Sequence, residues 1–255
     1  MEKKQTALIT CNFFQEESCA WITLSVPEKR NALSSGVMEE LRETLNTLQK
    51  HPHVRVVVLS GDDRAFAAGV DLTEVACMTP EKALNTFYLG DSWRSLTHFP
   101  LPTIAAVSGY ALGGGFELAL MCDLIVATET ARFGFPEVTL GLLPGLGGTQ
   151  KLTRLIGPYR AAELCFTGHF LTAKEAAALG VLTQVASEKD LKEVVLSLAQ
   201  KISQQPKTSL QLIKKAIACS QEAPLSVGLD FERQLFFTAL ATSEKEKRTK
   251  RFYND

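Results

Sequence analysis

The sequence lacks an excess of positive charge. Its 27 Lys and Arg residues are balanced by 28 Asp and Glu residues, which gives a formal net charge of −1 at pH 7. Domains that bind nucleic acid usually carry a strongly basic surface, so no nucleic-acid partner is expected. With 45% hydrophobic and 22% charged residues, the 255-residue chain suits a globular protein with one sizeable core.

Paired cysteines and grouped metal ligands are also missing. The six cysteines form no CxxC pair, and the four histidines do not cluster with cysteines or carboxylates. Because zinc sites need ligands at recognisable spacings, we expect no metal site. Scattered thiols are typical of a reducing compartment. The N-terminus has no hydrophobic signal-peptide core and no Arg-rich presequence, so a cytoplasmic protein is expected.

No apolar run is long and uniform enough to span a membrane. The most apolar passage, residues 101–127, contains Pro102, three consecutive glycines, Glu117 and Asp123. A spanning helix needs about 20 apolar residues with few charges. Each glycine costs a helix about 1 kcal/mol relative to alanine. The passage therefore predicts a buried strand, turn, helix and strand, and no membrane partner.

Patterns typical of strands and helices alternate through residue 186, and only helical patterns follow. Runs such as "VRVVVLSG", "PTIAAVSG" and "DLIVAT" predict buried strands. Residues 34–50 predict an amphipathic helix with leucines on one face. Residues 81–99 predict another helix, and residues 62–72 predict a loop.

Three further helices are predicted over residues 188–203, 206–221 and 225–241. Apolar strands that end on small residues recur in the first part of the chain, which suggests a stacked, repeated core. The order predicts an α/β fold, with a repeated core over residues 1–190 and an all-helical region over residues 191–255.

The glycine run at 113–115 and the carboxylate of Glu117 interrupt the apolar passage. A P-loop would need a Lys followed by Ser or Thr, and a dinucleotide fingerprint would need glycine at position 118, which is Leu. The run could simply form a tight turn from strand to helix. It could also bring backbone N–H groups up to a ligand at a helix N-terminus, where they would stabilise developing negative charge.

A second carboxylate, Glu137, stands in the apolar segment "FGFPEV". Burial raises the pKa of a carboxyl, and a like-charged neighbour raises one of a pair further. Such a pair can remove one proton and deliver another. The segment "AFAAGVDL" supplies a second turn of small residues, where Ala68 and Gly69 could offer another free N–H.

Four segments together resemble the crotonase, or enoyl-CoA hydratase/isomerase, family. They are "FAAGVDL", "PTIAAVSGYALGGGFELALMCD", "FGFPEVTLGLLPGLGGTQKLTRLIG" and "LTAKEAAALGVL", and the resemblance runs from about Leu24 to Leu240. It implies a crotonase-like α/β fold, a spiral of ββα repeats with an all-helical C-terminal trimerisation region. A homotrimer or homohexamer is the implied assembly, and the apolar residues of the C-terminal helices agree with a partner surface.

The resemblance also implies a reaction. The N–H groups of Ala68 and Gly114 would form an oxyanion hole for a thioester carbonyl, Glu117 would activate water for attack on C3, and Glu137 would protonate C2. The implied activity is hydration of a 2-trans-enoyl-CoA to a 3-hydroxyacyl-CoA. No separate cofactor is expected, because coenzyme A is part of the acyl-CoA substrate.

Two alternatives remain. A Δ3,Δ2-enoyl-CoA isomerase, or another CoA-thioester enzyme of the same family, would use the same scaffold, and isomerases of the family often keep only the second glutamate. A non-catalytic CoA-binding or assembly module is the other alternative. It has no need of two lone carboxylates in apolar surroundings, which are costly to bury.

The segment "PEKRNAL" resembles the family's loop at the CoA nucleotide. Lys29 and Arg30 are therefore expected near adenine and phosphates, although an ordinary solvated turn would look the same. The tail "ATSEKEKRTKRFYND" departs from the family's usual ending, and its charge run from Glu244 to Arg251 is expected to form a solvated helix. Further substrate contacts are expected at Gly69, Val70, Asp71, Tyr110, Gly113, Pro136 and Gly145.

Overall fold

Two β-sheets form the body of the protein. The computed structural model describes residues 7–250 except 87–89. The larger sheet has the strand order β1-β2-β3-β5-β7-β10, and only β1 runs antiparallel to its neighbour. Its strands are β1 (Ile9–Phe14), β2 (Cys19–Leu24), β3 (Val56–Ser60), β5 (Thr103–Val107), β7 (Leu124–Thr128) and β10 (Gln184–Ala186).

The smaller sheet has the order β4-β6-β8-β9. Its strands have three residues each: β4 (Ala65–Ala67), β6 (Tyr110–Leu112), β8 (Arg132–Gly134) and β9 (Phe170–Thr172). Consecutive strands alternate between the sheets, since β3, β5 and β7 lie in the larger sheet and β4, β6 and β8 in the smaller. A helical segment follows each pair, so the predicted ββα repeats are confirmed.

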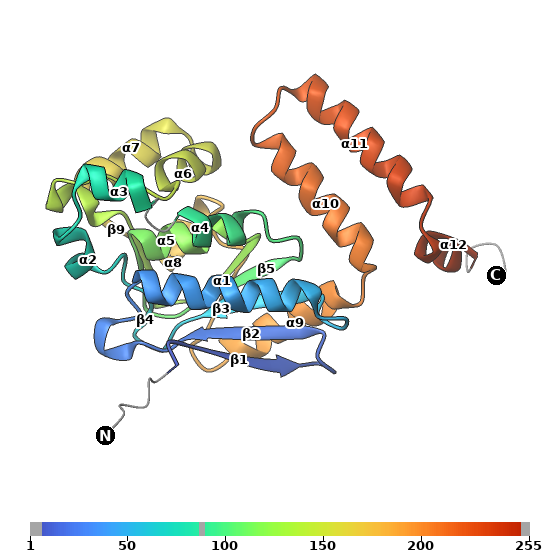
Figure 1. The fold of residues 1–255 in the computed structure, drawn as a ribbon, viewed down its shortest axis with the longest axis horizontal. Helices are drawn as coiled ribbons and strands as arrows, with labels where there is room; N and C mark the ends of the chain where they lie inside the picture. The colour runs from blue at the N-terminus through green and yellow to red at the C-terminus, as the bar shows by residue number, and fades with distance from the viewer. Residues whose placement is uncertain (1–6, 87–89, 251–255) are drawn as a thin grey trace.

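The helices of the body cover these sheets (Figure 1). They include α1 (Ser35–Lys50), α2 (Leu72–Ala76), α3 (Pro80–Thr86), α4 (Gly90–Thr97), α5 (Gly114–Met121), α6 (Gly148–Ile156), α7 (Pro158–Thr167) and α8 (Ala173–Ala178), with short 3-10 turns η1 (Pro27–Lys29) and η2 (Pro136–Leu140).

The first long helix forms as its pattern predicts. The hydroxyl of Ser34 accepts a hydrogen bond from Val37 N–H and caps the start of α1. Leu41, Leu45 and Leu48, spaced at three and four residues, are buried on the face that packs on the core.

Several predictions about local structure are wrong or incomplete. The predicted loop over 62–72 contains strand β4, and the glycine turn is preceded by β6. A three-residue strand is too short to show a sequence period, and it forms here because its neighbours in the sheet pair with it. The single helix predicted over 81–99 is formed by α3 and α4, and residues 87–89 lie outside the described part of the chain.

The C-terminal part consists of helices, as predicted, but its first helix belongs to the core. Helix α9 (Leu191–Ser203) buries Leu191, Val195 and Ala199 against the larger sheet. The core therefore extends beyond residue 190, the predicted boundary. Helices α10 (Lys207–Ser220) and α11 (Leu225–Leu240) form a hairpin that projects from the body (Figure 1).

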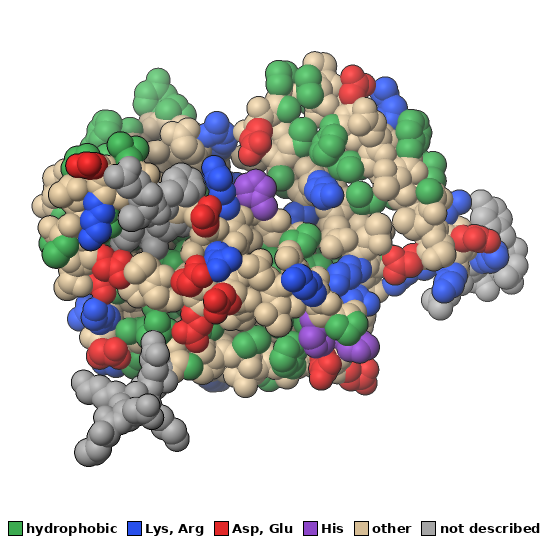
Figure 2. All heavy atoms as spheres, in the orientation of Figure 1, with side chains coloured by type: hydrophobic (Ala, Val, Ile, Leu, Met, Phe, Trp, Pro, Cys, Tyr) green, Lys and Arg blue, Asp and Glu red, His purple; other side chains and the backbone are tan. Residues whose placement is uncertain are grey.

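The projecting hairpin keeps its apolar side chains on the surface. Neither α10 nor α11 contains a buried residue, and Ile213, Ile217, Phe236 and Phe237 are all more than half exposed. Figure 2 shows hydrophobic side chains spread along this hairpin. The charged helix that follows, α12 (Ser243–Thr249), has no buried residue, as predicted for the described part of that run.

Across the described residues, no helix has both the length and the apolar character needed to cross a membrane.

Candidate active site

The glycine run forms the start of α5. Gly113 is the residue before the helix, with φ at +51°, and its carbonyl accepts a hydrogen bond from Glu117 N–H. Gly114 is the first helical residue. Its N–H points out of the helix end, where no intrahelical acceptor exists. Within the described residues, no protein group accepts a hydrogen bond from Gly114 N–H.

Each of the three glycines approaches a different part of the site. A Cβ on Gly113 would lie 2.7 Å from Glu137 Oε1, and a Cβ on Gly115 would lie 2.0 Å from the carbonyl oxygen of Ala67 in β4. A Cβ on Gly114 would lie 3.4 Å from the backbone nitrogen of Val70. The run therefore brings the helix end against a carboxyl and against the turn that follows β4.

A second backbone N–H, that of Val70, lies close to Gly114. Leu33 forms an isolated parallel bridge with Val70, so Leu33 N–H donates to Gly69 C=O at 2.8 Å, and Asp71 N–H donates to Leu33 C=O at 3.1 Å. The C=O of Gly69 and the N–H of Val70 belong to one trans peptide group and point in opposite directions. Val70 N–H therefore points away from Leu33, and it has no acceptor among the described residues.

The expectation that Ala68 supplies the second donor is wrong. Ala68 N–H donates to the carbonyl of Arg30 at 3.0 Å, so it is not free to bind a ligand. The free N–H two residues later, that of Val70, lies beside Gly114. The small residues of "AAG" gave no sign of this, because the choice of donor depends on pairing with the distant Leu33.

Glu117 is buried on α5 with only 1% of its surface exposed. Its Oε1 accepts hydrogen bonds from Leu146 N–H at 2.8 Å and from Gly148 N–H at 2.7 Å. Burial raises the pKa of this carboxyl, and the two backbone donors act in the opposite direction by stabilising the charged form. A Cβ on Gly148 would lie 2.9 Å from Glu117 Cγ, so only a glycine lets this donor come so close.

Glu137, in η2, has a different environment. Its Oε2 is buried and has no hydrogen-bond partner among the described residues. The pKa of Glu137 is raised to about 7, mainly by burial. Its own backbone N–H acts in the opposite direction, and the negative charge of Glu117 contributes a smaller upward shift. This carboxyl therefore holds a proton at neutral pH far more readily than an ordinary glutamate does.

The two glutamates lie in one neighbourhood, as their sequence context predicted. The charge of Glu117 acts on Glu137, and both charges contribute to raising the pKa of Cys165 in α7, where burial is the larger cause. Gly113, which precedes the free N–H of Gly114, touches the Glu137 carboxyl. One neighbourhood of the protein thus combines two free backbone donors with two carboxyls of unequal proton affinity.

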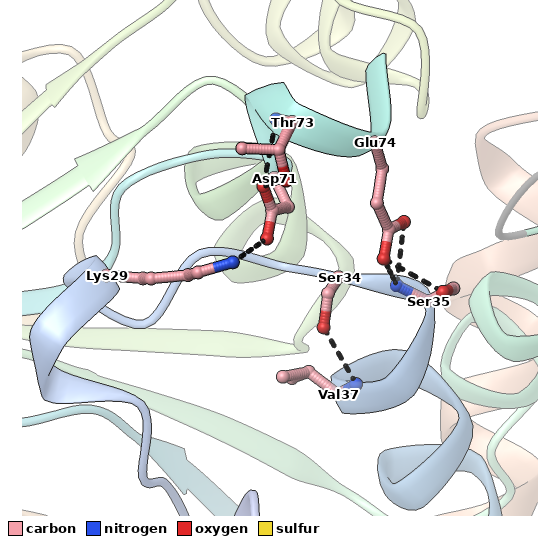
Figure 3. A network of polar contacts seen from close by, with 7 residues as sticks. All are labelled: Lys29, Ser34, Ser35, Val37, Asp71, Thr73 and Glu74. Carbon is pink, nitrogen blue, oxygen red and sulfur yellow. Dashed lines mark hydrogen bonds and ion pairs between the residues drawn. The ribbon is translucent and has the colours of Figure 1, made fainter. Parts of the chain in front are cut away.

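Two of the expected CoA or substrate contacts are occupied by protein groups (Figure 3). Lys29 Nζ lies 2.6 Å from Asp71 Oδ2, and Asp71 Oδ1 accepts hydrogen bonds from the N–H and the hydroxyl of Thr73. Asp71 is 4% exposed and caps α2, so its carboxylate is engaged within the protein, and its expected contact with substrate stays a prediction. The Lys29 ammonium group is therefore paired with a carboxylate of the protein, whereas a contact with CoA phosphates was expected.

The sequence analysis did not identify the backbone donors of the turn 144–148. The glycines of "PGLGG" indicated a turn, but nothing indicated that Leu146 N–H and Gly148 N–H would hold Glu117. Among the residues expected at the substrate, Tyr110 is partly exposed on β6, and Gly145 borders open space. Substrate contacts of Arg30, Tyr110, Pro136 and Gly145 stay predictions.

In the described part of the chain, no three His, Cys, Asp or Glu side chains gather closely enough to hold a metal ion.

Comparison with known proteins agrees with this fold. The sequence model of the family described as enoyl-CoA hydratase/isomerase matches residues 15–254. A crystal structure of an enoyl-CoA hydratase subunit from Geobacillus kaustophilus HTA426 superposes with a TM-score of 0.93 and 42% identity, covering 97% of this chain and 95% of that one.

Two curated relatives are similar over most of their length. The probable enoyl-CoA hydratase echA8 of Mycobacterium tuberculosis is 42% identical over 226 residues, which is 89% of this chain and 88% of that protein. The 2,3-dehydroadipyl-CoA hydratase of Escherichia coli K12 is 41% identical with the same coverage. The chain therefore belongs to the enoyl-CoA hydratase/isomerase family, and it is an enzyme with the crotonase fold.

Proposed function

We propose that this enzyme hydrates a 2-trans-enoyl-CoA to a 3-hydroxyacyl-CoA. One observation carries the proposal: two free backbone N–H groups, of Val70 and Gly114, lie beside two carboxyls whose environments give them different proton affinities. Hydration of a conjugated thioester needs these parts, namely a site for negative charge on the carbonyl oxygen, a base for water and an acid for carbon.

In this mechanism the thioester carbonyl oxygen accepts hydrogen bonds from Val70 N–H and Gly114 N–H. When hydroxide adds to C3, negative charge moves through the conjugated system to that oxygen as an enolate. Backbone donors fixed in advance stabilise this charge more than they stabilise the substrate. The position of Gly114 at the start of α5 adds the positive end of the helix dipole.

Glu117 acts as the base. Both backbone donors bind its Oε1, and among the described residues no group donates to Oε2, which leaves that oxygen to accept a hydrogen bond from water. Glu117 takes one proton from this water while the oxygen bonds to C3. The bonds from Leu146 and Gly148 fix the direction of the carboxylate and favour its charged form.

Glu137 acts as the acid. A pKa of about 7 keeps a large fraction of the carboxyl protonated near neutral pH, and the unpaired Oε2 offers the proton without first breaking a protein hydrogen bond. Its proton passes to C2 as the enolate collapses. One water is then added across the double bond, and the two glutamates return to their starting charges by exchanging protons with solvent.

A panel of 2-enoyl-CoA and 3-enoyl-CoA thioesters tests this proposal. Purified enzyme is expected to consume 2-enoyl-CoA with formation of the 3-hydroxyacyl product, identified by mass. Conversion of 3-enoyl-CoA to 2-enoyl-CoA without hydration would favour the isomerase alternative, in which Glu137 alone shuttles a proton. Binding of every thioester without turnover would favour a non-catalytic CoA-binding module.

The α10–α11 hairpin is proposed to join copies of the chain into a homotrimer or homohexamer. Its exposed apolar side chains line a cavity of about 840 Å³ between the two helices. Exposed apolar surface of this extent is typical of a partner surface. Light scattering at micromolar concentration is expected to give three or six times the 27.9 kDa chain mass. A monomer would contradict this part of the proposal.

A further inference from the structure

Two segments of the chain are joined on the far side of the turn that carries Val70 N–H. Ala68 N–H donates to Arg30 C=O, Leu33 N–H donates to Gly69 C=O, and Asp71 N–H donates to Leu33 C=O. These three bonds flank the Val70 peptide group on both sides. The direction of Val70 N–H is therefore set by where residues 29–33 hold residues 68–71.

Residues 29–33 are themselves anchored. Arg30 and Asn31 both have positive φ, at +51° and +56°, a backbone region that costs energy for residues other than glycine. The buried side chain of Asn31 compensates this cost, because it accepts from Val26 N–H and donates to Ala65 C=O. Residues 29–33, which lie opposite Val70, are thus held in place and do not form a loose surface turn.

One side-chain contact joins residues 29–33 to the turn that carries Val70. Lys29 Nζ lies 2.6 Å from Oδ2 of Asp71, the residue directly after Val70, and the Asp71 side chain is 6% exposed. Oδ1 of the same carboxylate accepts from Thr73 N–H at 2.9 Å and so caps α2. Asp71 therefore ties Val70 to α2 on one side and to Lys29 on the other (Figure 3).

We propose that the Lys29–Asp71 ion pair is a positioning contact that sets the direction of Val70 N–H toward the thioester oxygen. The inference rests on the proposed function, because it gives Val70 N–H a role in stabilising the enolate. It assigns Lys29 to the geometry of the oxyanion site, in place of its expected contact with CoA phosphates. Neither residue touches the reacting atoms, and both act through the backbone of residue 70.

The chemistry of an oxyanion site makes such a contact matter. A hydrogen bond weakens steeply when its angle or length departs from the optimum. A displacement of about 1 Å in a reacting group can cost about 100-fold in rate. Loss of the ion pair removes one of the two tethers on Asp71, so we expect a loss of about 10- to 100-fold in kcat and little change in KM.

Four variants separate this role from a merely structural one. Asp71→Asn removes the charge but keeps an oxygen that can cap α2, since Asn is as good a helix cap as Asp. Lys29→Met keeps the length of the side chain and removes its charge. In the double variant the loss should equal that of either single variant, because both remove the same contact. Lys29→Arg, which keeps the charge that Lys29→Met removes, should retain most of the activity.

The bound carbonyl gives a direct readout. With a 13C-labelled thioester bound to the enzyme, the infrared stretch of the carbonyl reports the hydrogen bonds it accepts. We expect this stretch to move toward the free-thioester frequency in Lys29→Met and in Asp71→Asn. Arg160→Met, which breaks the exposed Arg160–Glu163 ion pair on α7, is the matched control and should leave the stretch and kcat unchanged.

Several outcomes would overturn the inference. A raised KM with unchanged kcat in Lys29→Met would show that Lys29 binds the CoA phosphates. Losses that add in the double variant would show that the two residues act separately. An unchanged carbonyl stretch in both single variants would also overturn it, even if one of them loses stability.

Failure of the proposed function gives a different result. In that case the wild-type protein binds the thioester and shifts its carbonyl stretch, but adds no water to C3. The effect of Lys29→Met and Asp71→Asn on the stretch then still tests the positioning contact. Melting temperatures of all variants identify any that fail to fold, and Lys29→Met, at a half-exposed side chain, keeps the test available if Asp71→Asn does not fold.

Discussion

The regions around Glu117 and Glu137 hold the same functional group in different ways. At Glu117 the turn 144–148 supplies two backbone donors to one carboxylate oxygen, which favours the charged form. At Glu137 the short 3-10 turn η2 supplies no donor to the buried Oε2, and burial raises the pKa to about 7. One region is built to hold a negative charge and the other to hold a proton.

This difference gives each carboxyl its role without any change in side-chain chemistry. Proton affinities that differ within one site identify the base and the acid of a reaction. The charge of Glu117 also helps Glu137 to keep its proton, so the two regions support each other. Changing one region at a time therefore tests whether the other region still works.

The largest expected effect is that of Glu137→Gln. Gln preserves the size of the side chain but cannot donate a carboxylic proton to C2 or take one back. General acid–base groups contribute about 10²- to 10⁴-fold, so both hydration of 2-enoyl-CoA and isomerisation of 3-enoyl-CoA should fall by at least that factor. Steady-state assays with both substrates check this, and retention of either reaction at the wild-type rate would remove Glu137 from the mechanism.

A smaller effect is expected from Gly148→Ala. The new Cβ would lie 2.6 Å from the ring of Phe135 and 2.9 Å from Glu117 Cγ, so the donor must move away from the carboxylate. We expect hydration to fall about 10- to 100-fold, since a misplaced catalytic group loses that much, while isomerisation changes less. Gly36→Ala in α1, far from both glutamates in the chain, is the matched control.

The pH dependence of hydration should reflect the pKa values of both carboxyls. Glu137 must be protonated to act as an acid, so kcat/KM should fall as pH rises through about 7, the raised pKa of Glu137. Glu117 must be charged to act as a base, so kcat/KM should fall at low pH, on a limb that lies above the ordinary glutamate pKa because burial raises it. A profile flat from pH 6 to 9 would contradict the assignment of the acid.

The smallest expected effect is on stability. The pKa of Glu137 is higher in the folded than in the unfolded chain, so its contribution is most favourable below about pH 4.5 and is lost as pH rises to about 7. Glu137→Gln removes this loss. One pKa unit corresponds to about 1.4 kcal/mol, and partial solvent exposure reduces the effect. The free energy of unfolding of the variant minus that of wild type should therefore be about 1–2 kcal/mol larger at pH 8 than at pH 4.

Urea unfolding at the two pH values measures that difference. Glu163→Gln, which changes an exposed carboxyl of α7, is the matched control. Glu175→Gln would not serve, because Glu175 caps α8. An equal free-energy difference between Glu137→Gln and wild type at both pH values would show that burial does not perturb Glu137.

Much of the fold could be predicted from the sequence where a residue's own pattern decides its structure. The five-residue strands β3, β5 and β7 are continuous apolar runs, and α1 shows a leucine period and a Ser34 cap. The three-residue strands of the smaller sheet carry no such period. They exist because neighbouring repeats stack, which is a property of the assembled spiral.

The site divides in the same way. Glu117, Glu137 and Gly114 could be found because a lone carboxylate or a glycine run stands out in an apolar segment. The donor at Val70 could not, because the bridge from Leu33 decides which peptide of the 68–70 turn presents a free N–H. The backbone donors to Glu117 come from a turn about thirty residues away and carry no side-chain signal.

The measurement that tests the account most directly is the activity of Glu117→Gln with two substrates. Gln keeps the size of the side chain and its acceptor oxygen, so the bonds from Leu146 and Gly148 can persist. We expect 2-enoyl-CoA hydration to fall by about 10²- to 10⁴-fold while 3-enoyl-CoA isomerisation through Glu137 stays measurable. Near-normal hydration by this variant would contradict the division of roles between the two glutamates.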